Sequence, residues 1–210
     1  DGDADRMMAV DENGDFVPGD HLLALFARAA AGEGDVIPAP LNTSLVVDDA
    51  LDAVGASVAR TKVGDVFVAE RVAETDAPFG GEPSGAWIWP AETRCPDGPL
   101  AACRLAELAH ESGTLAGLLD GFDDYVTRRE SHSCTDTDAV VGAVHRRATT
   151  AYDDVDDLDG VRVETDDGWF LIRASGTQPL VRLTAEARTE ERASELLDGA
   201  RELLPEGVGQ

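Results

Sequence analysis

The feature that most constrains the fold of this chain is a regular alternation of strand-like and helix-like patterns after the Gly32-Glu33-Gly34 break. Short apolar runs predict buried strands, and each is followed by a run with helical periodicity. The predicted strands cover residues 36–40, 57–60 and 78–79, and the predicted helices cover 44–54, 65–74 and 97–111. This order predicts βαβ units and a mostly parallel sheet over residues 33–116.

The sequence patterns on either side of that segment are different. Residues 1–32 contain a strand pattern, an Asn13-Gly14 turn signal, a return strand and a helix, and we interpret them as the end of a preceding domain. Residues 117–210 predict an α+β domain with an antiparallel sheet. Its predicted strands lie within 122–134 and at 161–165, 169–173 and 180–187, and its predicted helices cover 137–149 and 189–204. Because the chain starts at Asp1 without a methionine, we expect it to be the C-terminal part of a longer protein.

The charge of the chain restricts its partners. Its 210 residues include 42 acidic and only 17 basic residues, for a net charge of −25, and the acids are spread along the whole sequence. Such a surface predicts a cytoplasm of very high salt, where repulsion between carboxylates is screened. It should repel nucleic acid and anionic membranes. An anionic substrate would therefore need arginines placed locally around its binding site.

Cysteine usage and hydropathy both favour a cytoplasmic protein. Cys95, Cys103 and Cys134 form no C-x-x-C pair, so we interpret them as small apolar residues and not as metal ligands. The sequence has no signal peptide and no apolar run near 18 residues, which excludes a predicted membrane-spanning helix.

The first six residues, Asp1-Gly2-Asp3-Ala4-Asp5-Arg6, place three carboxylates at alternate positions. That spacing lets Asp1, Asp3 and Asp5 converge on one hard cation, as Mg²⁺ or Ca²⁺ requires. An EF-hand calcium loop is the sharper alternative, but it needs glycine at position six, where this chain has Arg6, and helices on both sides. Three solvated aspartates are the simplest alternative.

Two glycine-containing loops offer polar groups to a ligand. In Gly80-Gly81-Glu82-Pro83-Ser84-Gly85, Glu82 can accept two hydroxyl hydrogen bonds and Ser84 can donate one; the alternative is an ordinary turn. In Arg173-Ala174-Ser175-Gly176-Thr177-Gln178-Pro179, a strand runs into Arg-x-Ser-Gly-Thr. Arginine binds phosphate bidentately, the hydroxyls of Ser175 and Thr177 can donate, and the turn at Gly176 exposes backbone N–H groups. Arg182 follows on the next strand; the alternative is a polar hairpin.

These motifs together resemble those of the α-D-phosphohexomutases, which include phosphoglucomutase, phosphomannomutase and phosphoglucosamine mutase. Residues 1–6 look like the family's DGDxDR metal loop, 81–85 its GExSG sugar loop and 173–179 its RxSGTxP phosphate loop. Arg60-Thr61-Lys62-Val63-Gly64-Asp65 looks like its third-domain substrate loop, which implies that Lys62, Gly64 and Asp65 bind substrate. The stretches at 85–89 and 95–98 look like archaeal phosphoglucosamine mutase-like sequences, which together with the charge suggests a halophilic archaeon.

The resemblance implies a four-domain enzyme, of which residues 1–32, 33–116 and 117–210 would be the end of domain two, domain three and domain four. It implies reversible exchange of phosphate between positions 1 and 6 of a hexose phosphate, through a phosphoserine and a hexose bisphosphate. Phosphoglucosamine mutase or phosphomannomutase activity is favoured. Asp1, Asp3 and Asp5 would hold Mg²⁺ and Arg6 would stabilise the transferring group.

The sequence also departs from the family in several places. The serine loop is missing, so this chain alone is expected to be inactive and to need N-terminal domains of the same protein. Ala86, Val66 and Gln178 replace residues usual in the family. A non-catalytic sugar-phosphate-binding relative and a calcium-stabilised structural domain are the alternatives.

Overall fold

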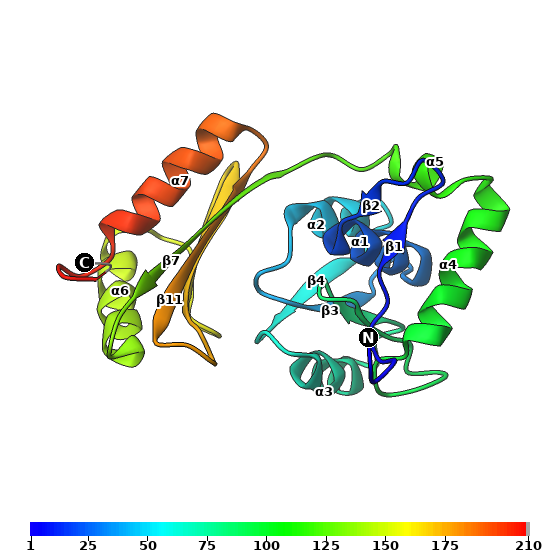
Figure 1. Ribbon diagram of the computed structural model, residues 1–210, viewed down its shortest axis with the longest axis horizontal. Helices are drawn as coiled ribbons and strands as arrows, with labels where there is room; N and C mark the ends of the chain where they lie inside the picture. Colours follow the sequence, from blue (N-terminus) through cyan, green and yellow to red (C-terminus); the bar gives the residue numbers. More distant parts are fainter. Residues whose placement is uncertain (209–210) are drawn as a thin grey trace. The chain divides into compact units, whose positions relative to one another are not determined.

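The computed structural model describes residues 1–208, and the chain forms two compact units that divide between Asp123 and Asp124 (Figure 1). Residues 1–123 form unit 1, and the described residues from 124 to 208 form unit 2. Among the residues that the structure describes, no helix is long and apolar enough to cross a membrane.

Unit 1 begins with the predicted hairpin and helix. Strands β1 (Ala9–Val10) and β2 (Phe16–Val17) pair antiparallel around a turn in which Gly14 has a φ of +89°. Helix α1 (Gly19–Ala30) follows, with its apolar side fully buried. The aromatic core lies against this helix: the Phe26 ring is 5.4 Å from that of Trp87 and 5.1 Å from that of Trp89, measured between centroids.

The predicted α/β arrangement of unit 1 is confirmed. Strands β3 (Val36–Pro40) and β4 (Ser57–Thr61) pair in parallel, connected by helix α2 (Leu45–Asp52), and helix α3 (Asp65–Thr75) follows β4. Strands β5 (Gly80–Glu82) and β6 (Ala86–Ile88) form a short antiparallel hairpin whose first strand lies beside β3. The carboxyl ends of β3 and β4 therefore meet at one edge, which is where α/β folds bind ligands.

The boundary suggested by the sequence, between residues 116 and 117, falls within unit 1, inside a short helix. Helix α4 (Gly98–Ser112) ends at Gly113, and the short helix α5 (Leu115–Leu119) begins after Thr114, whose hydroxyl accepts the Gly117 N–H at 3.1 Å. Glu12 accepts the backbone N–H groups of Leu115 and Ala116. This end of unit 1 is therefore tied to the β1–β2 hairpin.

Unit 2 is the predicted α+β domain. Its five strands, in spatial order β7-β11-β10-β9-β8, are all antiparallel. Helices α6 and α7 pack on one face of the sheet and share one apolar core with it (Figure 1). The elements are β7 (Val126–Ser133), α6 (Thr137–Ala151), β8 (Val155–Asp156), β9 (Val161–Thr165), β10 (Gly168–Ala174), β11 (Leu180–Ala187) and α7 (Glu190–Glu202).

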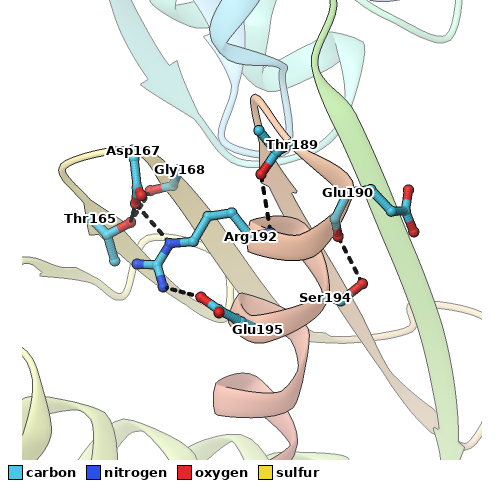
Figure 2. A network of polar contacts seen from close by, with 8 residues as sticks. All are labelled: Thr165, Asp167, Gly168, Thr189, Glu190, Arg192, Ser194 and Glu195. Carbon is cyan, nitrogen blue, oxygen red and sulfur yellow. Dashed lines mark hydrogen bonds and ion pairs between the residues drawn. The ribbon is translucent and has the colours of Figure 1, made fainter.

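A polar network joins the β9–β10 turn to the first turns of α7 (Figure 2). Arg192 donates from Nε to Asp167 at 2.9 Å and from Nη1 to Glu195 at 2.9 Å, while its backbone N–H bonds to the Thr189 hydroxyl that caps the helix. The hydrogen bonds to Glu195 and Asp167 raise the pKa of Arg192. The arginine is occupied by these acids, so we assign it a structural role.

Candidate functional site

The acidic loop, residues 1–6, lies on the surface of unit 1. Asp1 and Asp3 are exposed and Asp5 is half-buried, and Ala4 between them has a left-handed φ of +59°. Arg6 donates from Nε to the Asp1 carboxylate at 2.6 Å, so this carboxylate already has a partner within the motif.

The donor set of this loop suits a hard cation, although its carboxylates do not converge here. Within residues 1–208, no cluster of three or more His, Cys, Asp or Glu side chains is arranged to hold a metal ion. One oxygen of Asp5, Oδ1, is buried and has no hydrogen-bond partner. A buried carboxylate oxygen without a donor is costly unless a cation or another donor compensates it. This orphaned oxygen and the all-carboxylate set fit Mg²⁺ chemistry.

The acidic loop and the sugar loop lie side by side although about 80 residues separate them. The Met7 N–H bonds to the Gly85 carbonyl at 3.0 Å, and Arg6 forms an isolated bridge with Ala86. The Trp87 indole N–H donates to the Met7 carbonyl at 2.9 Å. Gly85 has a φ of +105°, and a Cβ there would lie 3.0 Å from the Met7 carbonyl oxygen, so this junction requires glycine.

The sugar loop is the turn of the β5–β6 hairpin. The Gly85 N–H bonds to the Glu82 carbonyl at 3.0 Å and closes the turn. The Glu82 side chain is half-buried and Ser84 is exposed. The two side chains predicted to contact sugar hydroxyls are thus carried by one rigid turn, next to the acidic loop.

The predicted substrate loop leaves the carboxyl end of β4 and enters α3. Gly64 is the N-cap of α3 with a φ of +136°, which a side chain would rarely adopt. Lys62 is exposed, and its Nζ lies 5.9 Å from the centre of the Phe67 ring. Asp65 lies in the first turn of α3, where a carboxylate is favoured by the helix dipole. Lys62 is therefore the group of this loop best placed to meet an anion.

The phosphate loop of unit 2 connects β10 to β11. The Ser175 N–H bonds to the Leu180 carbonyl at 2.9 Å and closes the loop, which leaves Gly176 and Thr177 exposed. Arg173 ends β10 and its Nη1 lies 3.5 Å from Asp159. The exposed Arg182 is the register partner of Arg173 on β11. Two arginines and a partly exposed Ser-Gly-Thr turn thus lie at one end of the sheet.

Sequence reasoning missed the residues that hold these loops in place. Gly98, which was predicted to lie at a helix start but not to contact the acidic loop, donates its N–H to the Ala4 carbonyl at 3.1 Å. Asp159, the partner of Arg173, carried no signal of its own in an acid-rich chain. The structure brings the acidic and sugar loops together within unit 1, and it places Arg173, Ser175, Gly176, Thr177 and Arg182 together within unit 2.

Comparison with known proteins gives matches along most of the chain. The sequence matches the family model "Phosphoglucomutase/phosphomannomutase, alpha/beta/alpha domain III" over residues 18–125 and the model of the C-terminal domain of the same family over residues 128–203. It is 46% identical to a probable phosphoglucosamine mutase of Methanococcoides burtonii, over 99% of this chain and 47% of that protein. A protein of the same description from Methanopyrus kandleri is 47% identical, over 94% and 45%. The chain spans about half the length of the curated relatives that it matches.

Solved structures give the same picture of the fold. A phosphoglucomutase/phosphomannomutase family protein of Burkholderia thailandensis is similar with a TM-score of 0.84 at 27% identity, over 96% of this chain and 44% of that one. The N-acetylphosphoglucosamine mutase of Aspergillus fumigatus, solved in complex with GlcNAc-6P and magnesium, has a TM-score of 0.66 at 19% identity, over 97% and 50%. The second likeness concerns the fold alone.

Proposed function

The chain belongs to the phosphoglucomutase/phosphomannomutase family, and from this membership we propose that it is the sugar- and phosphate-binding part of a phosphohexomutase. Its reaction is the reversible exchange of phosphate between positions 1 and 6 of a hexose phosphate. The names of the archaeal relatives favour glucosamine phosphate as the substrate, with mannose phosphate second. The observation that carries the proposal is the Ser-Gly-Thr turn between Arg173 and Arg182, in which Gly176 and Thr177 are exposed.

The phosphate loop holds the phosphate that does not react. Arg173 offers a planar fork that matches two phosphate oxygens, and the exposed turn at Gly176 and Thr177 offers backbone and hydroxyl donors. Ser175 adds a second hydroxyl and Arg182 a second positive charge. Because the surrounding chain carries a net charge of −25, this local positive charge is what allows an anion to bind.

The loops of unit 1 handle the sugar and the reacting end. Glu82 and Ser84 bind a pair of ring hydroxyls, which suits both orientations of the substrate because the same two groups can serve each. Arg6 stabilises the phosphoryl group in transfer, and Lys62, with Gly64 and Asp65, contacts the substrate from the start of α3. Phosphoryl transfer is catalysed mainly by positioning and charge neutralisation, which are the tasks these residues can perform.

Asp1, Asp3 and Asp5 would hold the Mg²⁺ ion. The ion would neutralise negative charge on the phosphoryl group and its donor. The buried, unpartnered oxygen of Asp5 supports this assignment. So does the magnesium in the fold relative from Aspergillus fumigatus. The nucleophile would be a phosphoserine outside these 210 residues, since no Ser-His-Asn-Pro loop occurs in them.

We also infer a working environment of high salt, in the cytoplasm of a halophilic archaeon. The chain has 42 acidic and 17 basic residues, and the acids are spread along the whole sequence and not gathered at one site. Screening by molar salt would remove most of the repulsion between them.

The proposal is tested by assaying a full-length protein that contains this chain. With Mg²⁺ and a hexose bisphosphate activator, ³¹P NMR should show conversion of glucosamine 6-phosphate to the 1-phosphate. Arg173→Gln should reduce kcat/KM roughly 30-fold, because a charged hydrogen bond contributes about 2 kcal/mol. The isolated 210-residue chain should show no turnover. Absence of conversion with glucosamine, mannose and glucose phosphates alike, or an unaffected Arg173→Gln enzyme, would refute it.

A further inference from the structure

The face of the unit 2 sheet that α6 and α7 leave uncovered carries a row of arginines. On β11, Val181, Leu183 and Ala185 belong to the core shared with the helices, so Arg182 and Thr184 point to the opposite face. The register then places their partners on that face too: Ser131 lies opposite Arg182, and Arg129 lies opposite Thr184. On the other side of β11, Arg173 lies opposite Arg182.

Three positive charges therefore lie on three adjacent strands. Directly opposed like charges destabilise a sheet, and Arg173 and Arg182 are such a pair. Arg129 is the diagonal neighbour of Arg182, one strand further from the phosphate loop. Arg129 and Arg173 are separated by two strand spacings across the sheet and by two residues along it, so their Cα atoms are on the order of 12 Å apart. A cluster of this kind is stable when an anion neutralises it.

One acid, Glu186, lies on the same face two residues beyond Thr184, and its carboxylate accepts hydrogen bonds from the Thr127 hydroxyl and the Trp169 indole N–H. Arg128, the neighbour of Arg129 on the core side of β7, forms an ion pair with Glu190, and Arg201 pairs with Glu130 of the same strand. Among the described residues, Arg129 and Arg182 have no hydrogen bond or ion pair to an acidic side chain, although both are exposed. The exposed Arg94 and Arg146 also have no acidic partner among the described residues. Arg129 and Arg182 differ from them because they are diagonal neighbours on one sheet face, beside the phosphate loop, where one anion can meet both guanidinium groups.

Hydroxyl groups accompany both arginines. Ser131 faces Arg182 and Thr184 faces Arg129 across the β7–β11 pair, at the short separation of opposed residues. Guanidinium forks with nearby hydroxyl donors are the groups that recognise phosphate oxygens. The position is continuous with the phosphate loop through Arg182, so one ligand could reach both.

We propose that Arg129 and Arg182, with Ser131 and Thr184, form a second anion-binding position beside the phosphate loop, and that it takes the second phosphate of a hexose bisphosphate. The inference rests on the proposed function, because it assumes that the loop at 173–177 binds the first phosphate. Arg129 would then select the bisphosphate over the monophosphates. The second anion-binding position would keep the bisphosphate bound to the protein while neither of its phosphates is in contact with the transferring serine.

The test is calorimetric titration of the 210-residue chain with glucose 6-phosphate and with glucose 1,6-bisphosphate at constant ionic strength. The parent should bind the bisphosphate at least tenfold more tightly. Arg129→Gln should weaken bisphosphate binding roughly 30-fold, the effect of losing one charged hydrogen bond, and leave monophosphate binding within about twofold. Arg146→Gln is the matched control, since Arg146 is an exposed arginine on α6, on the other face of the sheet.

The outcomes separate this inference from the proposed function. If the parent binds the monophosphate but prefers it to the bisphosphate, or if Arg129→Gln weakens both ligands equally or neither, the second position is refuted and the phosphate loop stands. If the parent binds neither ligand, both proposals are wrong. Unchanged melting temperatures of Arg129→Gln and Arg146→Gln would exclude a folding defect as the cause of any loss.

Discussion

The substitution Gly19→Ala tests whether the start of α1 packs directly against the backbone of the sugar loop. Gly19 is the first residue of α1, and a Cβ placed on it would lie 1.8 Å from the carbonyl oxygen of Pro83 and 2.7 Å from its carbonyl carbon. Both atoms belong to the backbone of the sugar loop, which cannot rotate away as a side chain could. Either the start of α1 or the turn that carries Glu82 and Ser84 must move.

Two effects of this substitution oppose each other. Alanine is more favourable than glycine within a helix by about 1 kcal/mol. Overpacking costs about 1–3 kcal/mol, and a contact so far inside van der Waals distance belongs at the upper end of that range. The steric term should therefore win, with a net loss of about 2 kcal/mol. For a chain of this size, such a loss lowers the melting temperature by about 4–8 °C.

Differential scanning calorimetry at constant KCl measures this effect, together with titration of a hexose phosphate. Gly142→Ala is the control, because a Cβ at Gly142 in α6 would meet only the Arg146 guanidinium, at an ordinary 3.6 Å. It should stabilise the protein, by up to about 1 kcal/mol. A Gly19→Ala protein that is as stable as the parent and binds hexose phosphate equally well would show that α1 and the sugar loop are not packed as described.

Three further outcomes are expected. Two hydrogen bonds from Arg201 hold the pKa of Glu130 below its usual 4.5. The Glu130 carboxylate therefore stabilises the fold above that pH, and this contribution is lost as the pH falls. The Glu130→Gln protein should have a lower melting temperature than the parent at pH 7, and the difference should vanish at pH 3. Asp5→Asn should abolish Mn²⁺ binding followed by electron paramagnetic resonance without lowering the melting temperature in metal-free buffer, and retained binding would move the metal elsewhere. The melting temperature should rise from dilute buffer to molar KCl, and a flat response would contradict the proposed high-salt environment.

Much of the fold followed from local patterns. Both helices and the four longer strands of unit 2 were predictable because alternating apolar residues, turn signals and a Thr189 cap lie close together in sequence. The two-residue strand β8 was missed, because so short a strand has no periodic pattern. Helix α5 was missed because a domain boundary was predicted within it, between residues 116 and 117. The Thr114 cap and the bonds from Leu115 and Ala116 to the distant Glu12 stabilise a helical turn there.

The candidate site was less accessible from sequence, since it depends on contacts between distant residues. The motifs located the loops, but the bond from Trp87 to Met7 that joins two of them spans 80 positions. The spacing of the acidic motif suggested convergence of three carboxylates, and the Arg6–Asp1 pair opposes that arrangement. Alternation along β7 implies that Arg128 and Arg129 point to opposite faces, but only the strand register shows which face is open.

The central claim, that unit 2 binds phosphate at the loop between β10 and β11, can be measured directly by NMR. Titration of the ¹⁵N-labelled chain with glucosamine 6-phosphate should shift the amide signals of Ser175, Gly176 and Thr177 in a saturable way, and Arg173→Gln should weaken that response roughly 30-fold. Signals of α6 should stay in place. Saturable shifts confined to the helices of unit 2, or an Arg173→Gln titration identical to that of the parent, would contradict the account.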